Sequence, residues 1–221
     1  MTDVRTYEMS PFDNVLYLPN NVDIRLCPKN GMSTIKELFR RHKGHSEYVG
    51  RSYRYDAVKR EGDQLDLPFR KGSYRIAIRR DPVDRFKSAC EYILQNRAEH
   101  IRRGRAFDLP EIETELESVI SRMELGTLKN NHFYTQSWYL GKPEDYDMVF
   151  NINEMGKLIS FLNESCEFGF HENIHKLKVN ETKLKMYNDA ITPIQMLRIK
   201  KLYAKDYING WCKQEDHRGR A

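Results

Sequence analysis

The feature that most constrains the fold is a strand, a glycine-containing loop and a helix that follow one another early in the chain. Residues 22–27 have the composition of a short buried strand, and the polar run 28–33 contains Gly31. A helical pattern comes next, in which Thr34 and Glu37 have the spacing of a capping box. This order predicts a helix whose amino end faces a loop at the carboxyl end of a strand.

The same order of elements occurs a second time. We expect a strand at 74–78, a turn at 79–81 and a helix with Asp81 as its N-cap and Pro82 as its first residue. Apolar residues then recur at helical spacing, namely Val83, Phe86, Cys90, Ile93 and Leu94. Strands that alternate with helices favour a parallel sheet.

Further elements are predicted later in the chain. Apolar spacing indicates a helix around 116–123, a strand at 147–150, a helix from Met155 that is capped by Asn153, and a final helix over 193–207. We therefore expect an α/β fold with a central parallel sheet flanked by helices. In such sheets ligands bind at the carboxyl ends of the strands, where both loops described above would lie.

The composition bounds the organisation and the partners of the chain. Its 221 residues fit one domain, 1–221. The 37 Lys and Arg exceed the 32 Asp and Glu by five, but the charges are interspersed and no nucleic-acid-binding motif occurs, so no nucleic-acid partner is expected. The four cysteines form no CxxC pair, which argues against a zinc site and against a disulfide framework. Because the amino end is polar and no 18 apolar residues run together, we expect a cytoplasmic protein without a membrane segment.

The loop at 28–34 has the residue types of a phosphate-binding loop. Glycine and small hydroxyl residues before a helix present backbone N–H groups and the positive end of the helix dipole to an anion. Lys29 precedes Gly31, whereas a Walker P-loop has its lysine after the last glycine, which argues against a kinase or an NTPase. The alternative is an ordinary turn with a solvated lysine.

The second loop has residues suited to another phosphate. Arg80 lies just before the predicted helix and Ser88 lies about two turns into it. The planar guanidinium fork matches an oxyanion, and a serine hydroxyl adds one more hydrogen bond. The alternative is that Asp81 and Pro82 form a plain helix start and that the arginines pair with neighbouring carboxylates.

Taken together, the two loops resemble the cofactor-binding motifs of sulfotransferases. The segment Pro28-Lys29-x-Gly31-x-Ser33-Thr34 resembles their 5′-phosphosulfate-binding loop, and Arg80-Asp81-Pro82-x-x-Arg85-x-x-Ser88 resembles their 3′-phosphate-binding motif. Downstream, the chain is similar to the carbohydrate sulfotransferases of the chondroitin/HNK-1 type, at Asn131-His132-Phe133, Gln136, Tyr146-Asp147, Glu154 and Tyr203-x-x-Asp206-Tyr207. It departs from them at Phe133, where that family usually has tryptophan, and it lacks their paired cysteines between His132 and Tyr146. We also expect it to differ from them in having no membrane anchor.

The resemblance implies a P-loop-like sulfotransferase fold and a donor, 3′-phosphoadenosine-5′-phosphosulfate (PAPS). The donor-binding residues it implies are Lys29, Asn30, Gly31, Met32, Ser33, Thr34, Arg80 and Ser88. Lys29 would contact the bridging oxygen of the departing 5′-phosphate, and His132 would be the general base that activates the acceptor hydroxyl. The implied acceptor is a carbohydrate, and no metal is required.

Several alternatives stay open. The alternative bases are His42, His45, Glu47 and Glu61. They lie in or beside a long charged loop at 43–71, which we expect to form one wall of the acceptor site. Two other functions are carried as alternatives. They are a nucleotide-dependent, kinase-like phosphotransferase and a non-catalytic domain that binds anions on the same fold.

Overall fold

The computed structural model describes residues 15–35, 38, 69–102, 116–128, 130–170 and 191–212, with the backbone alone for 94–102 and Asn131. The chain divides into two compact units, which are described separately. The first comprises Met1–Arg79 and Trp138–Asn180, and the second comprises Arg80–Ser137 and Glu181–Ala221. The predicted loop at 43–71 lies outside the described residues except for its last three.

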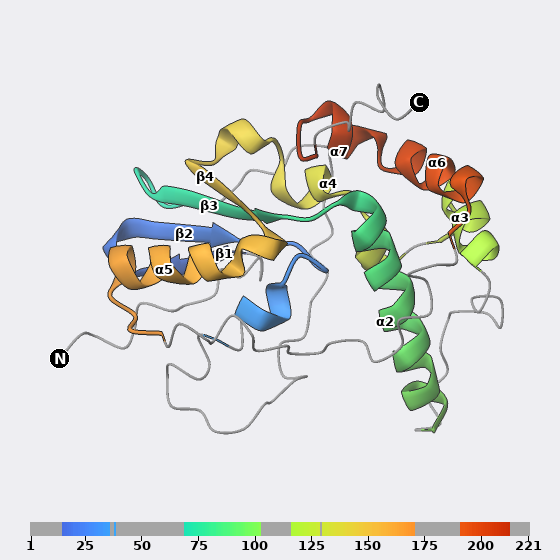
Figure 1. Ribbon diagram of the computed structural model, residues 1–221, viewed down its shortest axis with the longest axis horizontal. Helices are drawn as coiled ribbons and strands as arrows, with labels where there is room; N and C mark the ends of the chain where they lie inside the picture. The colour runs from blue at the N-terminus through green and yellow to red at the C-terminus, as the bar shows by residue number, and fades with distance from the viewer. Residues whose placement is uncertain are drawn as a thin grey trace, which may run out of the picture. The chain divides into compact units, whose positions relative to one another are not determined.

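The first unit is built on a four-stranded sheet (Figure 1). Its strands are β1 (Val15–Leu18), β2 (Val22–Arg25), β3 (Tyr74–Arg79) and β4 (Met148–Asn151), in that spatial order. β2, β3 and β4 are parallel, with Ile24 opposite Ile76 and Ile76 opposite Met148. The predicted α/β class with parallel strands at 22–27, 74–78 and 147–150 is therefore confirmed within one or two residues.

The edge strand β1 was not predicted, and it makes the sheet mostly rather than wholly parallel. It pairs antiparallel with β2, with Leu18 opposite Val22. Only Pro19, Asn20 and Asn21 separate the two strands, and both asparagines have positive φ, 55° and 57°. Asparagine tolerates this left-handed conformation better than most residues do, which permits a reversal this short.

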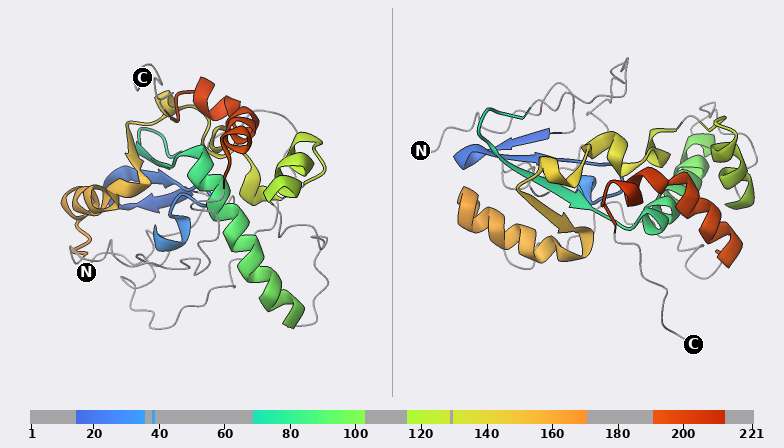
Figure 2. Two further views of the ribbon diagram at one scale, coloured as in Figure 1. Left: turned by 45° about the vertical axis from the view of Figure 1, so that its right-hand side comes forward. Right: turned by 90° about the horizontal axis from the view of Figure 1, so that it is seen from above.

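One face of this sheet is covered by α5 (Met155–Cys166), which runs along the strands in Figure 1 and in the right view of Figure 2. Leu158, Ile159 and Leu162 of the helix are buried with Ile24 of β2 and Ile76 of β3. The core also contains Val22 of β2 and Ile78 of β3, so the core residues alternate along each strand, and those of the helix recur at three- and four-residue spacing.

The start of α5 corrects one prediction. The expected cap, Asn153, lies inside a short 3-10 helix (Ile152–Glu154) that precedes α5. The cap of this turn is Asn151, whose side chain accepts a hydrogen bond from the N–H of Asn153 at 3.0 Å. Glu154 completes a capping box by accepting from the N–H of Asn151 at 2.9 Å. Asn151 and Asn153 are both suitable cap residues, so the sequence alone did not distinguish them.

The second unit is helical. It contains α2 (Pro82–Arg102), α3 (Leu116–Glu124), a 3-10 helix (Asn131–Phe133), α6 (Pro193–Leu202) and α7 (Ala204–Ile208), and α4 (Gln136–Leu140) begins in it. Its core joins the predicted apolar face of α2 to the other helices, and the buried residues include Val83, Phe86, Cys90, Ile93, Val119, Ile120, Phe133, Ile199 and Tyr203. The predicted helices at 82 onward and 116–123 are confirmed.

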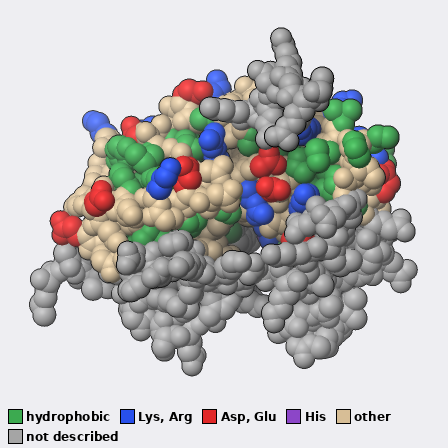
Figure 3. Space-filling view, in the orientation of Figure 1, with side chains coloured by type: hydrophobic (Ala, Val, Ile, Leu, Met, Phe, Trp, Pro, Cys, Tyr) green, Lys and Arg blue, Asp and Glu red, His purple; other side chains and the backbone are tan. Residues whose placement is uncertain are grey.

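The carboxyl-terminal helix is interrupted, contrary to the single helix predicted over 193–207. Tyr203 has φ −101° and ψ 20°, which ends α6, and α7 starts at the next residue. Tyr203 is fully buried, so packing of its ring takes precedence over the regular helix at this point. On α6 the side chains of Ile194 and Leu197 are exposed, and Figure 3 shows hydrophobic side chains at the surface over this helix.

Candidate functional site

The first candidate phosphate site, in the first unit, is a tight turn that follows β2. The N–H of Asn30 donates to the carbonyl of Cys27 at 3.1 Å, which closes a four-residue turn with Pro28 in its second position. Lys29 occupies the third position with φ +70°. Proline followed by a residue with positive φ is the pattern of a type II turn, whose third position is normally glycine. A lysine is therefore held in a backbone conformation that disfavours side chains.

The turn is anchored to the sheet by Asn30. This side chain is only 1% exposed, and its Nδ2 donates to the carbonyl of Ile78 in β3 at 2.8 Å. Because β2 and β3 are parallel, the turn and the end of β3 lie at the same edge of the sheet, the carboxyl edge. The sequence predicted this edge for the loop but gave Asn30 no anchoring role.

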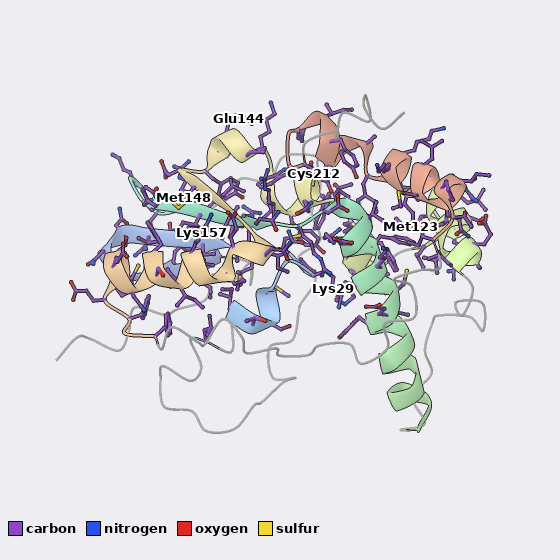
Figure 4. All side chains as sticks on the ribbon, in the orientation of Figure 1. Lys29, Met123, Glu144, Met148, Lys157 and Cys212 are labelled. Atoms are coloured by element: carbon purple, nitrogen blue, oxygen red, sulfur yellow. The ribbon has the colours of Figure 1, made fainter. Side chains whose placement is uncertain are left out.

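A helix starts directly after the turn, as Figure 4 shows beside the labelled Lys29. Its first intrahelical bond runs from the N–H of Ile35 to the carbonyl of Gly31, at 3.0 Å. The N–H groups of Met32, Ser33 and Thr34 precede this bond, so they lie at the open end of the helix where an anion is favoured. The predicted capping box is wrong, because Thr34 is already inside the helix, and Glu37 lies outside the described residues.

The backbone conformation at position 31 favours glycine, whereas the space around it would admit a side chain. Gly31 has φ +81°, and a Cβ added there would meet Met155 and Ile152 at 3.7 to 3.8 Å, which is ordinary contact. With Lys29, the short segment contains two residues of positive φ around Asn30. This conformation turns the chain sharply from the strand into the helix. It explains the glycine of the motif without invoking a ligand.

The second candidate phosphate site, in the second unit, is the start of α2. Oδ1 of Asp81 accepts hydrogen bonds from the N–H groups of Val83 at 2.8 Å and Asp84 at 3.1 Å. The carbonyl of Asp81 accepts from the N–H of Arg85 at 2.8 Å. Asp81 is thus the N-cap and Pro82 the first helical residue, as predicted.

Arg80 lies just ahead of this cap and is half-buried. Burial lowers the pKa of its guanidinium, while the carboxylates of Asp84 and Glu91 act in the opposite direction. Arginine nevertheless stays charged in proteins, so this is a partly desolvated cation. The two carboxylates also give substance to the alternative in which Arg80 serves as an ion-pair partner.

Two other residues of the motif have different surroundings. Arg85 is fully buried; it donates to the carbonyl of Tyr134 and its guanidinium lies 6.0 Å from the centre of the Tyr203 ring. These contacts give it a structural role in the second unit. Ser88 is half-buried on α2, eight residues beyond Arg80, and its assignment to a phosphate stays a prediction.

The backbone of Arg80 is held by a residue to which the sequence assigned no function. Gln136 accepts from the N–H of Arg80 at 2.9 Å and donates from Nε2 to its carbonyl at 2.8 Å. Gln136 is itself fully buried, and its own N–H donates to Asp206 at 2.9 Å. The only sequence signal for either residue was its place in the family-like stretches.

His132, the predicted base, belongs to the second unit. It is half-buried in the 3-10 helix, its ring centre lies 4.7 Å from that of Tyr92, and its N–H donates to Oδ1 of Asn130 at 3.0 Å. Lys29 belongs to the first unit, so the predicted proximity of the two side chains stays a prediction. The alternative bases His42, His45, Glu47 and Glu61 lie outside the described residues.

Three further family-like residues have structural contacts in the first unit. Tyr146 donates to the carbonyl of Leu140 at 2.6 Å, and burial raises the pKa of its hydroxyl. Oδ2 of Asp147 accepts from the N–H of Arg75 at 2.7 Å, which ties the approach to β4 to β3. Glu154 serves in the capping box described above, where its pairing with Lys157 lowers its pKa.

Comparisons with known proteins give no match from which a function could be inferred. No family model, no curated protein and no solved structure matches the chain. Among the described residues, no three His, Cys, Asp or Glu side chains are grouped so that they could hold a metal ion. Within the same part of the chain, every helix is too short or too polar to cross a membrane.

Proposed function

We propose that the chain is a sulfotransferase that moves a sulfuryl group from PAPS to the hydroxyl of an acceptor, and that the acceptor is a carbohydrate. The observation that carries the proposal is the turn at Lys29. Here a lysine is held at φ +70° directly before the open end of a helix, on a turn fixed to the sheet by Asn30. A lysine with positive φ directly before the amino end of a helix is a costly backbone arrangement for a plain turn and a useful one at an anion site.

In this proposal the first unit binds the 5′-phosphosulfate. The N–H groups of Met32, Ser33 and Thr34, with the two hydroxyls, hold the phosphate, while Asn30 and Gly31 shape the turn. The second unit supplies Arg80 and Ser88 for the 3′-phosphate. The carbohydrate acceptor and the P-loop-like sulfotransferase fold rest on the family resemblance.

The transfer step requires charge stabilisation and one proton acceptor. The bond between sulfur and the bridging oxygen breaks, its electron pair stays on the 5′-phosphate, and sulfur bonds to the acceptor oxygen. Lys29 stabilises the charge that develops on the leaving oxygen, a contribution that is largest in the transition state. His132 is proposed to take the proton of the acceptor hydroxyl as a neutral imidazole. The products are the sulfated acceptor and adenosine 3′,5′-bisphosphate, and no metal takes part.

The proposal is tested by transfer of label from ³⁵S-PAPS to a panel of glycans, small alcohols, lipids and tyrosine peptides. We expect a labelled glycan product with the unmodified protein and its loss with Lys29→Ala. The matched control is Lys157→Ala, which removes an exposed lysine of the same unit and should leave turnover unchanged. Near-normal turnover of Lys29→Ala would remove this lysine from the mechanism. Transfer from γ-labelled ATP instead would favour the kinase-like alternative.

The non-catalytic alternative makes a different prediction. In a domain that only binds anions there is no leaving oxygen, so Lys29 would serve only to bind the ligand. Lys29→Ala would then weaken the affinity for adenosine 3′,5′-bisphosphate. A transferase should retain most of that affinity and lose turnover, because the contact of Lys29 strengthens as the bond breaks. Measuring both quantities on the same variant separates the two readings.

A further inference from the structure

Gln136 forms a two-point clamp on the backbone of Arg80. Its amide oxygen accepts the N–H of Arg80 at 2.9 Å and its amide nitrogen donates to the carbonyl of Arg80 at 2.8 Å. The side chain that does this comes from 56 positions further along the chain and is fully buried. Cys212, labelled in Figure 4, adds a weaker contact from Sγ to the same carbonyl, at 3.5 Å. Both polar groups of this one residue's backbone are therefore fixed from outside its own loop.

The clamp is fixed in turn by Asp206. The two oxygens of this carboxylate accept the N–H groups of Gln136 at 2.9 Å and Ser137 at 2.7 Å, at the start of α4. Asp206 is fully buried, and hydrogen bonds to a buried carboxylate are stronger than those between neutral groups. A continuous series of hydrogen bonds thus runs from Asp206 through Gln136 to Arg80, entirely within the second unit.

This arrangement bears on the direction of the Arg80 side chain. Arg80 is joined on one side to β3, which ends at Arg79, and on the other to Asp81, the N-cap of α2. Fixing its N–H and carbonyl sets the position of Cα and the direction of the Cα–Cβ bond, from which the guanidinium extends. A planar fork binds an oxyanion well only in a narrow range of orientations, so a small displacement at the backbone reduces affinity strongly.

We propose that Gln136 and Asp206 are positioning residues that aim Arg80 at the 3′-phosphate of the bound nucleotide and so set the preference for nucleotides that carry one. This inference rests on the proposed function, since it assigns Arg80 to that phosphate. Neither residue contacts the nucleotide. Their effect should appear only for ligands with a 3′-phosphate.

The test compares two ligands that differ in that group, adenosine 3′,5′-bisphosphate and adenosine 5′-phosphate, by calorimetric titration of the full chain. The dissociation constant of adenosine 5′-phosphate divided by that of the bisphosphate measures the contribution of the 3′-phosphate to binding. Gln136→Met keeps the length of the side chain and removes both hydrogen bonds, and it should reduce the ratio by about tenfold, the worth of one charge-assisted bond. The affinity for adenosine 5′-phosphate should not change. Arg80→Ala sets the limit of the effect.

The matched control is Ser137→Ala. Its hydroxyl donates to the carbonyl of Lys205 at 3.1 Å, so the change removes a bond beside the clamp without touching Arg80. It should lower the thermal midpoint and leave the ratio unchanged. If the unmodified protein shows no preference for the bisphosphate, the proposed function itself fails. If that preference exists and Gln136→Met retains it in full, the positioning role is refuted.

A measurement on the unmodified protein covers the case in which Gln136→Met does not fold. Binding and clamp stability must be coupled in both directions. Saturating adenosine 3′,5′-bisphosphate should therefore slow hydrogen exchange at the amides of Arg80, Gln136 and Ser137 more than saturating adenosine 5′-phosphate does. Equal exchange with the two ligands at these amides would overturn the inference.

Discussion

Replacing Lys29 by glycine should give a more stable protein than replacing it by alanine, and it should abolish sulfuryl transfer. Lys29 has φ +70° in the third position of the turn that starts at Cys27. A side chain in this left-handed region is disfavoured by about 1–2 kcal/mol, because Cβ approaches the backbone carbonyl. Glycine has no Cβ, so the substitution relieves this strain while it removes the ammonium group from the proposed site.

The size of the effect follows from two opposed contributions. Glycine recovers the strain of about 1–2 kcal/mol and loses about 0.5–1 kcal/mol through the greater freedom of the unfolded chain. The expected gain is roughly 0.5–1 kcal/mol in the free energy of unfolding, relative to Lys29→Ala. Alanine is the right reference because it loses the same side-chain contacts and keeps Cβ.

The two variants are compared by urea unfolding followed by circular dichroism, with equal denaturant slopes as the condition for comparison. At an ordinary helical position the glycine variant would be the less stable one, so the predicted sign is the opposite of the usual one. A glycine variant that is less stable than Lys29→Ala would refute the strained turn. Both variants should be inactive in the transfer assay.

Three further predictions concern stability, each followed by chemical unfolding. Asp206→Ala leaves the N–H groups of Gln136 and Ser137 buried without their acceptor and should lower the free energy of unfolding by about 3–5 kcal/mol. Asp206→Asn keeps one acceptor oxygen and should lower it less, and equal losses in the two variants would refute the role of the two oxygens. Asp81→Ala removes the cap of α2 and should cost about 1 kcal/mol, whereas Asp81→Asn should be nearly neutral; an alanine variant as stable as the asparagine variant would contradict this. Burial raises the pKa of the Cys166 thiol to about 11, so its contribution to the free energy of unfolding is complete below the unfolded pKa of about 8.5 and should be lost as the pH rises toward 11. Cys166→Ala should flatten the decline of the free energy of unfolding over this pH range, and an unchanged slope would exclude the thiol as its source.

The elements that could be predicted from sequence are those whose signals are local. The start of α2 was found correctly because a cap and a first-turn proline act within three residues of each other, as the bonds from Asp81 show. β1 was missed because four residues carry too little pattern, and its pairing depends on two asparagines that adopt positive φ. The break at Tyr203 was missed because a buried ring, and not a proline or glycine, ends α6.

In the candidate site, too, the features that could be predicted are the local ones. The glycine-containing loop between β2 and the helix could be predicted, because its signals lie in adjacent residues. The anchor from Asn30 to Ile78 spans 48 positions, and the contact from Gln136 to Asp206 spans 70. No periodicity or spacing in one sequence reports such pairs. Resemblance indicated Gln136 and Asp206 but not that they hold the backbone of Arg80.

The most direct test of the central claim is a calorimetric titration of the unmodified protein with adenosine 3′,5′-bisphosphate and, separately, with ATP. A PAPS-dependent sulfotransferase should bind its bisphosphate product with one site per chain and at least about tenfold more tightly than ATP, a difference of about 1.4 kcal/mol. Arg80→Ala should remove most of that preference. Absence of binding at roughly millimolar bisphosphate, or tighter binding of ATP, would contradict the claim.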